Sequence, residues 1–138
     1  MQVKDIMTRD VESVTPKATI RELARKMRDG DVGILPIVEK EKLLGVVTDR
    51  DLVLRGLASD EADLDKLTAD TLMTDDVHRC REDQSLEDLR ATLESAAIRR
   101  IAVVDSDDRL VGMVSLGDLA KVESSDAGEA LKAISKAA

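Results

Sequence analysis

Residues 43–52 read Leu-Leu-Gly-Val-Val-Thr-Asp-Arg-Asp-Leu, and this stretch decides the fold of the chain. Its apolar first half favours a buried β-strand over residues 43–47. Thr48 follows the strand and Asp51 comes three residues later, which is the spacing of a helix N-cap and its reciprocal acidic partner. The stretch therefore predicts a strand that runs directly into a helix, which we expect to reach about Ala58.

A second copy of this stretch occupies residues 110–119, which read Leu-Val-Gly-Met-Val-Ser-Leu-Gly-Asp-Leu. Ser115 closes the apolar run as Thr48 closes the first one, and Asp118 again follows three residues later. Two copies of one strand-to-helix junction imply two equivalent sites, with the rest of the chain as their support.

The duplication covers most of the chain. The two halves are offset by 66 positions, and by 67 after the turn that precedes the last strand of each half. A repeat of this kind decides the fold before any single element does. Each half is expected to run strand, helix, strand, strand, helix, which indicates α/β (α+β) architecture. We expect the first repeat at residues 1–58, a linker at 59–69, the second repeat at 70–124 and a helical tail at 125–138. The positions that are identical in both halves include Met7, Thr8, Asp10, Val11, Leu23, Val38, Gly45, Val47, Asp51 and Leu52, each with its downstream twin.

Further signals place the first helix and the first short strands. Thr19 and Glu22 have the spacing of a capping box, so a helix is expected to begin at Thr19 and to stop before Gly30. Residues 12–14 read as a short strand. Residues 33–38 read as a strand that either lies at a sheet edge or is irregular at Pro36, because proline cannot donate a ladder hydrogen bond. Ser85 is expected to cap the corresponding helix of the second half.

The composition excludes several classes of function. The 138 residues carry a formal net charge of −8 and contain no Phe, Tyr or Trp, which opposes binding to nucleic acid or to an anionic membrane surface. No apolar run approaches the roughly 20 residues that a membrane span needs. A single cysteine allows no internal disulfide and suits the reducing cytoplasm, where we expect the protein to work.

The sequence offers no constellation for catalysis or for a metal. His78 is the only histidine, and no nucleophile elbow or Gly-rich phosphate loop is present. We therefore predict that the protein is not an enzyme, holds no metal and requires no cofactor. Cys80 is expected to be a small buried apolar residue, with redox sensing as the alternative.

Together these motifs resemble a tandem pair of CBS domains, often called a Bateman module. The resemblance covers roughly residues 3–124 and rests on the Met-Thr start of each half, the Leu-Pro-Ile-Val strand and the Gly-Val-Val-Thr-Asp-Arg-Asp-Leu junction. It implies two pseudo-two-fold-related β-α-β-β-α repeats, with sheets packed together and helices outside. It also implies a homodimer and two clefts that commonly bind AMP, ADP, ATP, S-adenosylmethionine or dinucleotides.

The chemistry of the junction fits such ligands. The hydroxyls of Thr48 and Ser115 lie at helix N-termini, which attract phosphate, and the carboxylates of Asp51 and Asp118 can accept hydrogen bonds from ribose hydroxyls. By the resemblance, each cleft takes its adenine walls from the other half. The Ser115/Asp118 cleft would use Val14, Thr15, Val32, Gly33 and Leu35, and the Thr48/Asp51 cleft would use Cys80, Arg81, Ile98, Arg99 and Ile101.

Basic residues distinguish the two clefts. Arg99 and Arg100 are adjacent and directly precede a buried strand, where the family that this chain resembles often places phosphate-binding basic groups. By the resemblance, Arg100 is expected to serve a phosphate in the Ser115/Asp118 cleft, with Arg50 as the candidate in the other. The alternative is a solvated pair that bridges to local acids. Arg81 and Glu82 stand where the first half has Thr15 and Pro16, which places charge beside an adenine wall and favours the Ser115/Asp118 cleft.

Two hypotheses follow. In the first, the protein is a homodimeric module that senses an adenosyl ligand and signals to an unknown protein partner. In the second, Thr48, Ser115, Asp51 and Asp118 are only helix caps, and the protein is a ligand-free dimeric scaffold with vestigial clefts.

Overall fold

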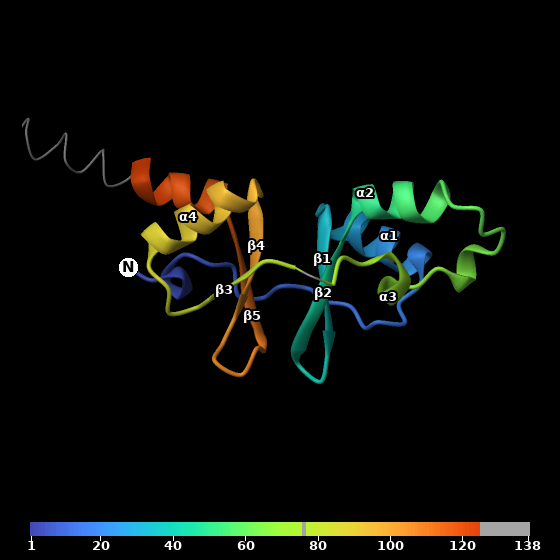
Figure 1. Cartoon of the computed structure of the whole chain (residues 1–138), viewed down its shortest axis with the longest axis horizontal. Coiled ribbons are helices and arrows are strands. Elements are labelled where there is room, and N and C mark those ends of the chain that lie inside the picture. The colour runs from blue at the N-terminus through green and yellow to red at the C-terminus, as the bar shows by residue number, and fades with distance from the viewer. Residues whose placement is uncertain (76, 125–138) are drawn as a thin grey trace, which may run out of the picture. The chain divides into compact units, whose positions relative to one another are not determined.

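The computed structural model describes residues 1–75 and 77–124, which form two compact units (Figure 1). The repeat-1 unit comprises Glu12–Val77 with Asp107–Leu110. The repeat-2 unit comprises Met1–Val11, His78–Ser106 and the chain from Val111 onward. The predicted helical tail at 125–138 lies outside the described residues. The mixed α/β class expected from the sequence is confirmed in both units.

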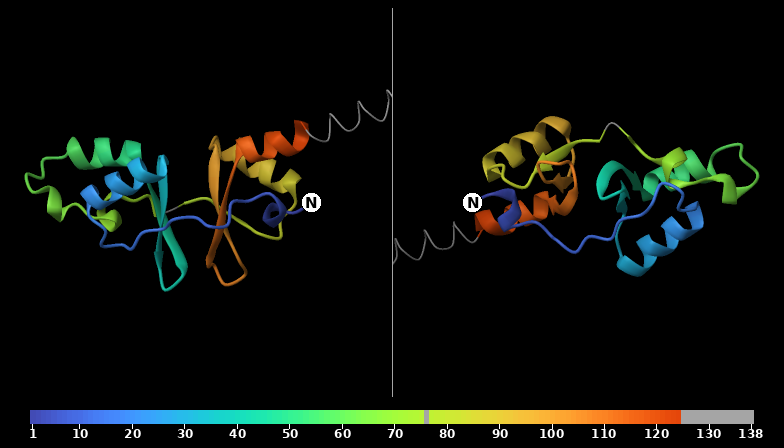
Figure 2. Two further views of the ribbon diagram at one scale, coloured as in Figure 1. Left: turned by 180° about the vertical axis from the view of Figure 1, so that it is seen from behind. Right: turned by 90° about the horizontal axis from the view of Figure 1, so that it is seen from below.

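The repeat-1 unit is built on a two-stranded antiparallel sheet, and its helices lie on one side of that sheet (Figure 2). Val14 adds a single parallel bridge to Ile37, so the strand predicted at residues 12–14 is reduced to one residue. The elements are α1 (Ile20–Gly30), β1 (Ile34–Glu39), β2 (Lys42–Thr48), α2 (Asp49–Asp51), the π-helix η2 (Leu52–Leu57), the 3-10 helix η3 (Leu64–Lys66) and α3 (Ala69–Leu72).

The repeat-2 unit has the same plan with a complete third strand. Its sheet has the order β3-β4-β5, and β3 pairs with β4 in parallel, with Cys80 opposite Val103. The elements are the 3-10 helix η1 (Val3–Asp5), β3 (Arg79–Arg81), α4 (Leu86–Ala96), β4 (Arg100–Val104), β5 (Leu110–Ser115) and a helix described over residues 116–124.

The segment that leads into each repeat packs on the other one. Thr8 exchanges two backbone hydrogen bonds with Met113 of β5, at N···O distances of 2.8 and 3.0 Å. Thr74 exchanges two with Val46 of β2, at 2.9 and 3.1 Å. The boundaries of the compact units therefore differ from those of the sequence repeats, because Met1–Val11 belongs to the repeat-2 unit. The boundaries given above for the repeats stay a prediction.

Each unit has its own apolar core, and β-branched or leucine side chains supply most of it. Apolar burial of this kind stabilises a fold by about 25 cal/mol for each Å² removed from water. The repeat-1 core consists of Val14, Ala18, Ile20, Leu23, Met27, Leu35, Ile37, Val47, Leu52, Ala69 and Leu72. The repeat-2 core consists of Val3, Met7, Cys80, Leu89, Leu93, Ile101, Val103 and Val114.

The helix starts follow the sequence signals closely. Thr19 and Glu22 form the predicted capping box of α1, and Ser85 accepts a hydrogen bond from the Asp88 N–H of α4 at 3.1 Å. The predicted stop is displaced by one residue, because Gly30 is the last residue of α1 and Asp31 takes the left-handed conformation with φ 50°. Aspartate tolerates that conformation better than most residues, so glycine is not required there.

The helix after Thr48 reaches Leu57, close to the predicted end, but its second part is a π-helix rather than an α-helix. Gly56 lies against α1 at this point: a Cβ added to it would approach Ile20 Cδ1 to 2.4 Å. The wider π-turn is the kind of local irregularity that sequence periodicity does not encode.

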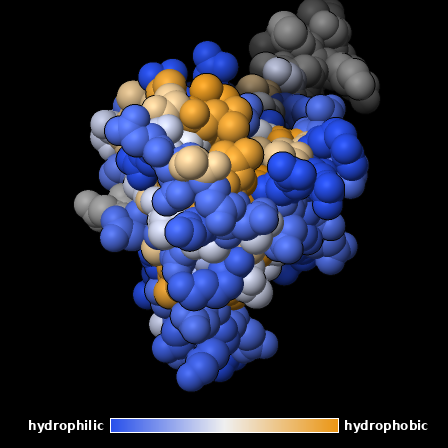
Figure 3. Space-filling view, turned by 90° about the vertical axis from the view of Figure 1, so that its right-hand side faces the viewer, coloured by the Kyte–Doolittle hydropathy of each residue, from blue (hydrophilic) through white to orange (hydrophobic). Residues whose placement is uncertain are grey.

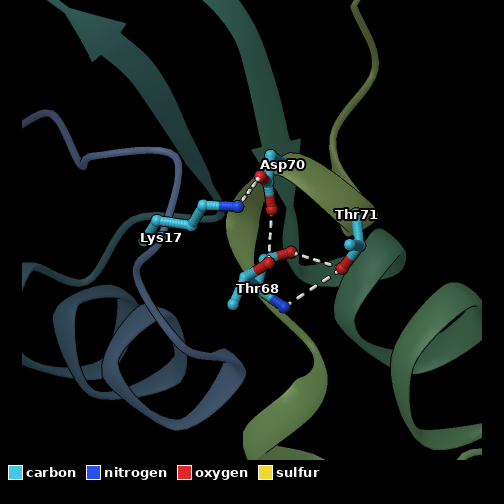
Figure 4. A network of polar contacts seen from close by, with 4 residues as sticks. All are labelled: Lys17, Thr68, Asp70 and Thr71. Carbon is cyan, nitrogen blue, oxygen red and sulfur yellow. Dashed lines mark hydrogen bonds and ion pairs between the residues drawn. The ribbon is translucent and has the colours of Figure 1, made fainter.

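A polar network fastens α3 to the loop before α1 (Figure 4). Lys17 Nζ lies 2.8 Å from Asp70 Oδ2, and the Thr68 hydroxyl donates to Asp70 Oδ1. Thr71 Oγ1 in turn donates to the Thr68 carbonyl at 2.7 Å. The hydrogen bond from Lys17, followed by the hydrogen bond from Thr68 and then the charge of Lys17, lowers the pKa of the Asp70 carboxyl.

Asp70→Asn is expected to reduce stability in a pH-dependent way. Because the folded-state pKa of Asp70 lies below its ordinary value of 3.8, its contribution is fully present above pH 3.8 and is lost as pH falls through the lower folded value. The difference in urea midpoint between wild type and Asp70→Asn should therefore shrink in acid. Asp60→Asn, at an exposed carboxylate, is the control, and an equally large, pH-independent effect of both variants would contradict the assignment.

Candidate functional site

The first junction is a reciprocal capping box at the end of β2. Thr48 N–H donates to Asp51 Oδ2 at 2.9 Å, and Asp51 N–H donates to Thr48 Oγ1 at 3.1 Å. The Asp51 side chain is only 14% exposed, and its second oxygen, Oδ1, lies 3.8 Å from Arg55 Nε. The Thr48 hydroxyl accepts one hydrogen bond here and keeps its own proton to donate.

The second junction has the same geometry at the end of β5. Ser115 N–H donates to Asp118 Oδ2 at 2.9 Å, and Asp118 N–H donates to Ser115 Oγ at 3.1 Å. Val122 stands where the first junction has Arg55, and Asp118 Oδ1 has no further partner among residues 1–75 and 77–124. The cap therefore uses one carboxylate oxygen and leaves the other to accept a hydrogen bond from another group.

Each junction is tied to the start of the preceding strand by one backbone hydrogen bond. Asp49 N–H donates to the Gly33 carbonyl at 3.0 Å, and Leu116 N–H donates to the Arg99 carbonyl at 2.7 Å. Two pairs of positions, 33 with 49 and 99 with 116, thus lie side by side in equivalent places of the two units.

The structure groups the predicted site residues by repeat. Val14, Thr15, Val32, Gly33 and Leu35 belong to the same unit as Thr48, Arg50 and Asp51. Cys80, Arg81, Ile98, Arg99, Arg100 and Ile101 belong to the same unit as Ser115 and Asp118. The exchange of adenine walls between the repeats stays a prediction.

Four of the predicted wall residues are core residues. Val14 and Leu35 belong to the repeat-1 core, and Cys80 and Ile101 belong to the repeat-2 core. Burial raises the pKa of the Cys80 thiol to about 11, so it stays a neutral thiol near pH 7, as expected for a small apolar residue. These positions can offer a ligand their backbone groups rather than their side chains.

The predicted phosphate-binding arginines are available. Arg50, Arg99 and Arg100 are exposed, and their guanidinium groups make no ion pair with any described residue. The alternative prediction, a solvated pair that bridges Arg99 and Arg100 to local acids, therefore finds no such bridge within the described chain.

A shallow hollow of about 250 Å³ lies beside the second junction. It is lined by Ile98, Arg99 and Leu116, together with Leu93, Glu94 and Ala97 from the end of α4. Ile98 and Arg99 were predicted to be site residues, whereas Leu116 and the α4 residues were missed. The signal that could have found Leu116 is its place directly after Ser115 in the duplicated motif.

The described part of the chain contains no cluster of three His, Cys, Asp or Glu side chains placed to hold a metal ion. No helix among the described residues is both long enough and apolar enough to cross a membrane.

Comparison with known sequences finds one domain family at two places in the chain. The sequence profile of the CBS domain matches residues 3–57 and 69–125. A relative in Bacillus subtilis, the CBS domain-containing protein YhcV, is 38% identical over 135 residues, which are 96% of this chain and 94% of that protein.

Solved structures of similar proteins contain several ligands. Hypoxic Response Protein I, with two coordinated zinc ions, has a TM-score of 0.79 and 34% identity over 88% of this chain and 98% of that one. CBSX2 from Arabidopsis thaliana, in complex with AMP, has a TM-score of 0.78 and 27% sequence identity, and the match covers 90% of this chain and 96% of that one. The CBS domain pair of protein MJ0100, in complex with 5′-methylthioadenosine and S-adenosylmethionine, has a TM-score of 0.77 and 27% sequence identity. The match covers 91% of this chain and 98% of that one.

Proposed function

Because the chain belongs to the CBS-domain family and carries the domain twice, we propose that it is a regulatory module that binds adenosyl ligands. The ligand class is AMP, ADP, ATP, S-adenosylmethionine or NAD, and a protein partner reads the bound state. The role is non-catalytic. The proposed compartment is the cytoplasm, for which the unpaired Cys80 is the supporting observation.

The observation that carries the proposal is the duplicated capping box. In each unit a hydroxyl and a carboxylate are held rigidly at a helix start, and the cap engages only one carboxylate oxygen. Ribose presents two adjacent hydroxyl donors, for which a fixed carboxylate is a suitable acceptor. The AMP complex of CBSX2 and the 5′-methylthioadenosine and S-adenosylmethionine complex of MJ0100 support this class of ligand.

Regulation requires that the ligand bind one conformation better than another. Each junction directly follows a strand, β2 or β5, and that strand is bridged to the segment that leads into the other repeat. A ligand held at a junction can thereby bias the position of that leading segment, which gives a partner something to read.

A thermal-shift series with AMP, ADP, ATP, S-adenosylmethionine and NAD tests the proposal. A ligand at 100 times its Kd stabilises the folded state by about 2.7 kcal/mol, which moves Tm by several degrees. We expect a saturable increase with at least one of the five and none with ribose 5-phosphate, which lacks the base. No increase with any of them would contradict the proposal.

One observation favours the scaffold as a second candidate. The capping boxes already use Thr48, Asp51, Ser115 and Asp118 as structural groups, so the motif has a role without any ligand. The scaffold predicts that no adenosyl compound changes Tm and that partner binding is the same with and without nucleotide.

We also propose that the protein acts as a homodimer through the exposed side of η2. Val53, Leu54 and Leu57 are 52%, 51% and 63% exposed, whereas Leu52 and Gly56 of the same helix are buried. Figure 3 shows an apolar patch at the top of its view. An apolar patch on a helix, rimmed by polar residues, is typical of a protein–protein interface.

Replacement of Leu54 and Leu57 together by lysine is expected to convert a dimer to a monomer. The change removes two apolar contacts and places like charges opposite each other across a two-fold interface. Light scattering after gel filtration should give twice the chain mass for wild type and for the control Ala62→Lys, which adds charge at another exposed position. A monomeric wild type at micromolar concentration would contradict the proposal.

A further inference from the structure

The two junctions differ most at the positions that the backbone hydrogen bonds place side by side. In the repeat-1 unit these positions hold Gly33 and Asp49. In the repeat-2 unit they hold Arg99 and Leu116. The same place therefore carries a carboxylate in one unit and a guanidinium in the other.

The Asp49 carboxylate lies directly over the start of β1. A Cβ added to Gly33 would be 3.1 Å from Asp49 Oδ2, so the carboxylate occupies the space that a side chain at position 33 would enter. Its other oxygen accepts the Arg50 N–H at 2.8 Å, which holds the group in place. In the repeat-2 unit, Arg99 is at the position that corresponds to Gly33, and the apolar Leu116 is at the position that corresponds to Asp49.

The residues next to these positions increase the difference in charge between the two junctions. Gly33, Ile34 and residues 49–51 include two acidic and one basic side chain, for a formal charge of −1. Arg99, Arg100 and residues 116–118 include one acidic and two basic side chains, for a formal charge of +1. Asp118 has a free carboxylate oxygen among the described residues, whereas the corresponding oxygen of Asp51 lies 3.8 Å from Arg55.

The hollow beside the second junction adds an apolar surface to this positive charge. Ile98 and Leu116 line it together with Arg99. In a protein without aromatic residues, a planar base must lie against such aliphatic side chains. The equivalent positions in the repeat-1 unit are Val32, Asp49 and Gly33, which offer one aliphatic side chain and a carboxylate.

From these differences we infer that the two junctions select adenosyl ligands by charge, an inference that rests on the proposed function. The repeat-2 junction takes a phosphorylated ligand of the AMP class, with Arg99 and Arg100 beside the phosphate. Ile98 and Arg99 then serve this junction and not the Thr48/Asp51 cleft, to which the family resemblance had assigned them. The repeat-1 junction takes an adenosyl ligand without phosphate, of the uncharged thioether or cationic sulfonium class, because Asp49 repels a phosphate there. Asp49 and Arg99 are the specificity-determining residues.

The test uses AMP and 5′-methylthioadenosine, which share adenosine and differ in charge, in titration calorimetry at pH 8. Asp118→Asn leaves only the repeat-1 junction intact, and Asp51→Asn leaves only the repeat-2 junction. We expect Asp118→Asn to bind 5′-methylthioadenosine at least about tenfold more tightly than AMP, and Asp51→Asn to show the reverse preference, since one unit charge at contact distance in a partly solvated site changes affinity by about this factor.

Exchange of the matched residues should exchange the preferences. In Asp118→Asn, the added change Asp49→Leu copies Leu116 and should raise AMP affinity about tenfold with little effect on 5′-methylthioadenosine. In Asp51→Asn, the added change Arg99→Gly copies Gly33 and should abolish the preference for AMP. Both positions are exposed, so the variants should fold, and circular dichroism checks this.

The outcomes separate the inference from the function on which it rests. If wild type binds neither compound, the proposed function fails together with the inference. If both compounds bind but Asp118→Asn binds AMP as tightly as wild type does, or Asp49→Leu leaves the ratio of the two affinities unchanged, the function stands and the charge selection is wrong.

Discussion

Asp118→Asn is expected to weaken AMP binding about 30-fold without destabilising the protein. The amide oxygen of asparagine can still accept the Ser115 N–H, so the cap that Asp118 provides is retained. The second carboxylate oxygen, however, becomes an NH₂ group that donates instead of accepting, and a ribose hydroxyl loses its charged acceptor. Charge-assisted hydrogen bonds contribute about 1.5–3 kcal/mol, and about 2 kcal/mol corresponds to the expected factor.

Asp88→Asn is the matched control for this experiment. Asp88 has the same place in the first turn of α4, with its N–H donated to the capping Ser85 Oγ at 3.1 Å, but it is not one of the predicted site residues. Calorimetry should show unchanged AMP affinity for Asp88→Asn, and urea midpoints should agree among the three proteins. An equal loss of affinity in both variants would mean that the effect is a general loss of charge rather than a lost ligand contact.

Gly45→Ala is expected to destabilise the repeat-1 unit by about 3 kcal/mol or more. A Cβ at position 45 would lie 2.4 Å from the Thr74 carbonyl oxygen and 3.1 Å from Met73 Sδ. The oxygen belongs to backbone and accepts the Val46 N–H, so it cannot move away without loss of the bridge between Val46 and Thr74. The added methyl group therefore separates the segment around Thr74, which leads into the second repeat, from β2.

Urea denaturation followed by circular dichroism measures this effect. Gly112→Ala is expected to act similarly in the repeat-2 unit, where the Cβ would lie 2.7 Å from both Thr8 O and Met7 Sδ. Gly30→Ala is the control, because its Cβ would meet only Val32 Cγ2 at an ordinary 3.6 Å, and alanine is the better helix former. A Gly45→Ala protein as stable as Gly30→Ala would contradict the close approach of Gly45 to the Thr74 carbonyl.

The parts of the fold that depend on local chemistry were predictable from the sequence. The capping pairs at Thr19, Thr48 and Ser115 are set by residues three positions apart, and their hydrogen bonds are present as expected. The strand-to-helix junctions were also predictable, because an apolar run and a cap lie next to each other in the chain. Duplication of the motif then predicted two equivalent junctions, and both capping boxes are present.

The remaining features depend on contacts between distant residues. The π-helix at Leu52–Leu57 accompanies the close packing of Gly56 on Ile20, 36 positions away in the sequence. Arg55 donates to the Met73 carbonyl at 3.0 Å, 18 positions away, which no local pattern indicates. The burial of Cys80 was expected from its residue type, but the motif does not distinguish whether a buried strand residue such as Ile101 faces the core or a ligand.

Native mass spectrometry of the wild-type protein with AMP and 5′-methylthioadenosine tests the central claim most directly, because it counts bound ligands and identifies each by mass. We expect a species that carries one of each ligand per chain, and loss of the AMP adduct alone in Asp118→Asn. A protein that stays unliganded at millimolar concentrations of both compounds would contradict it.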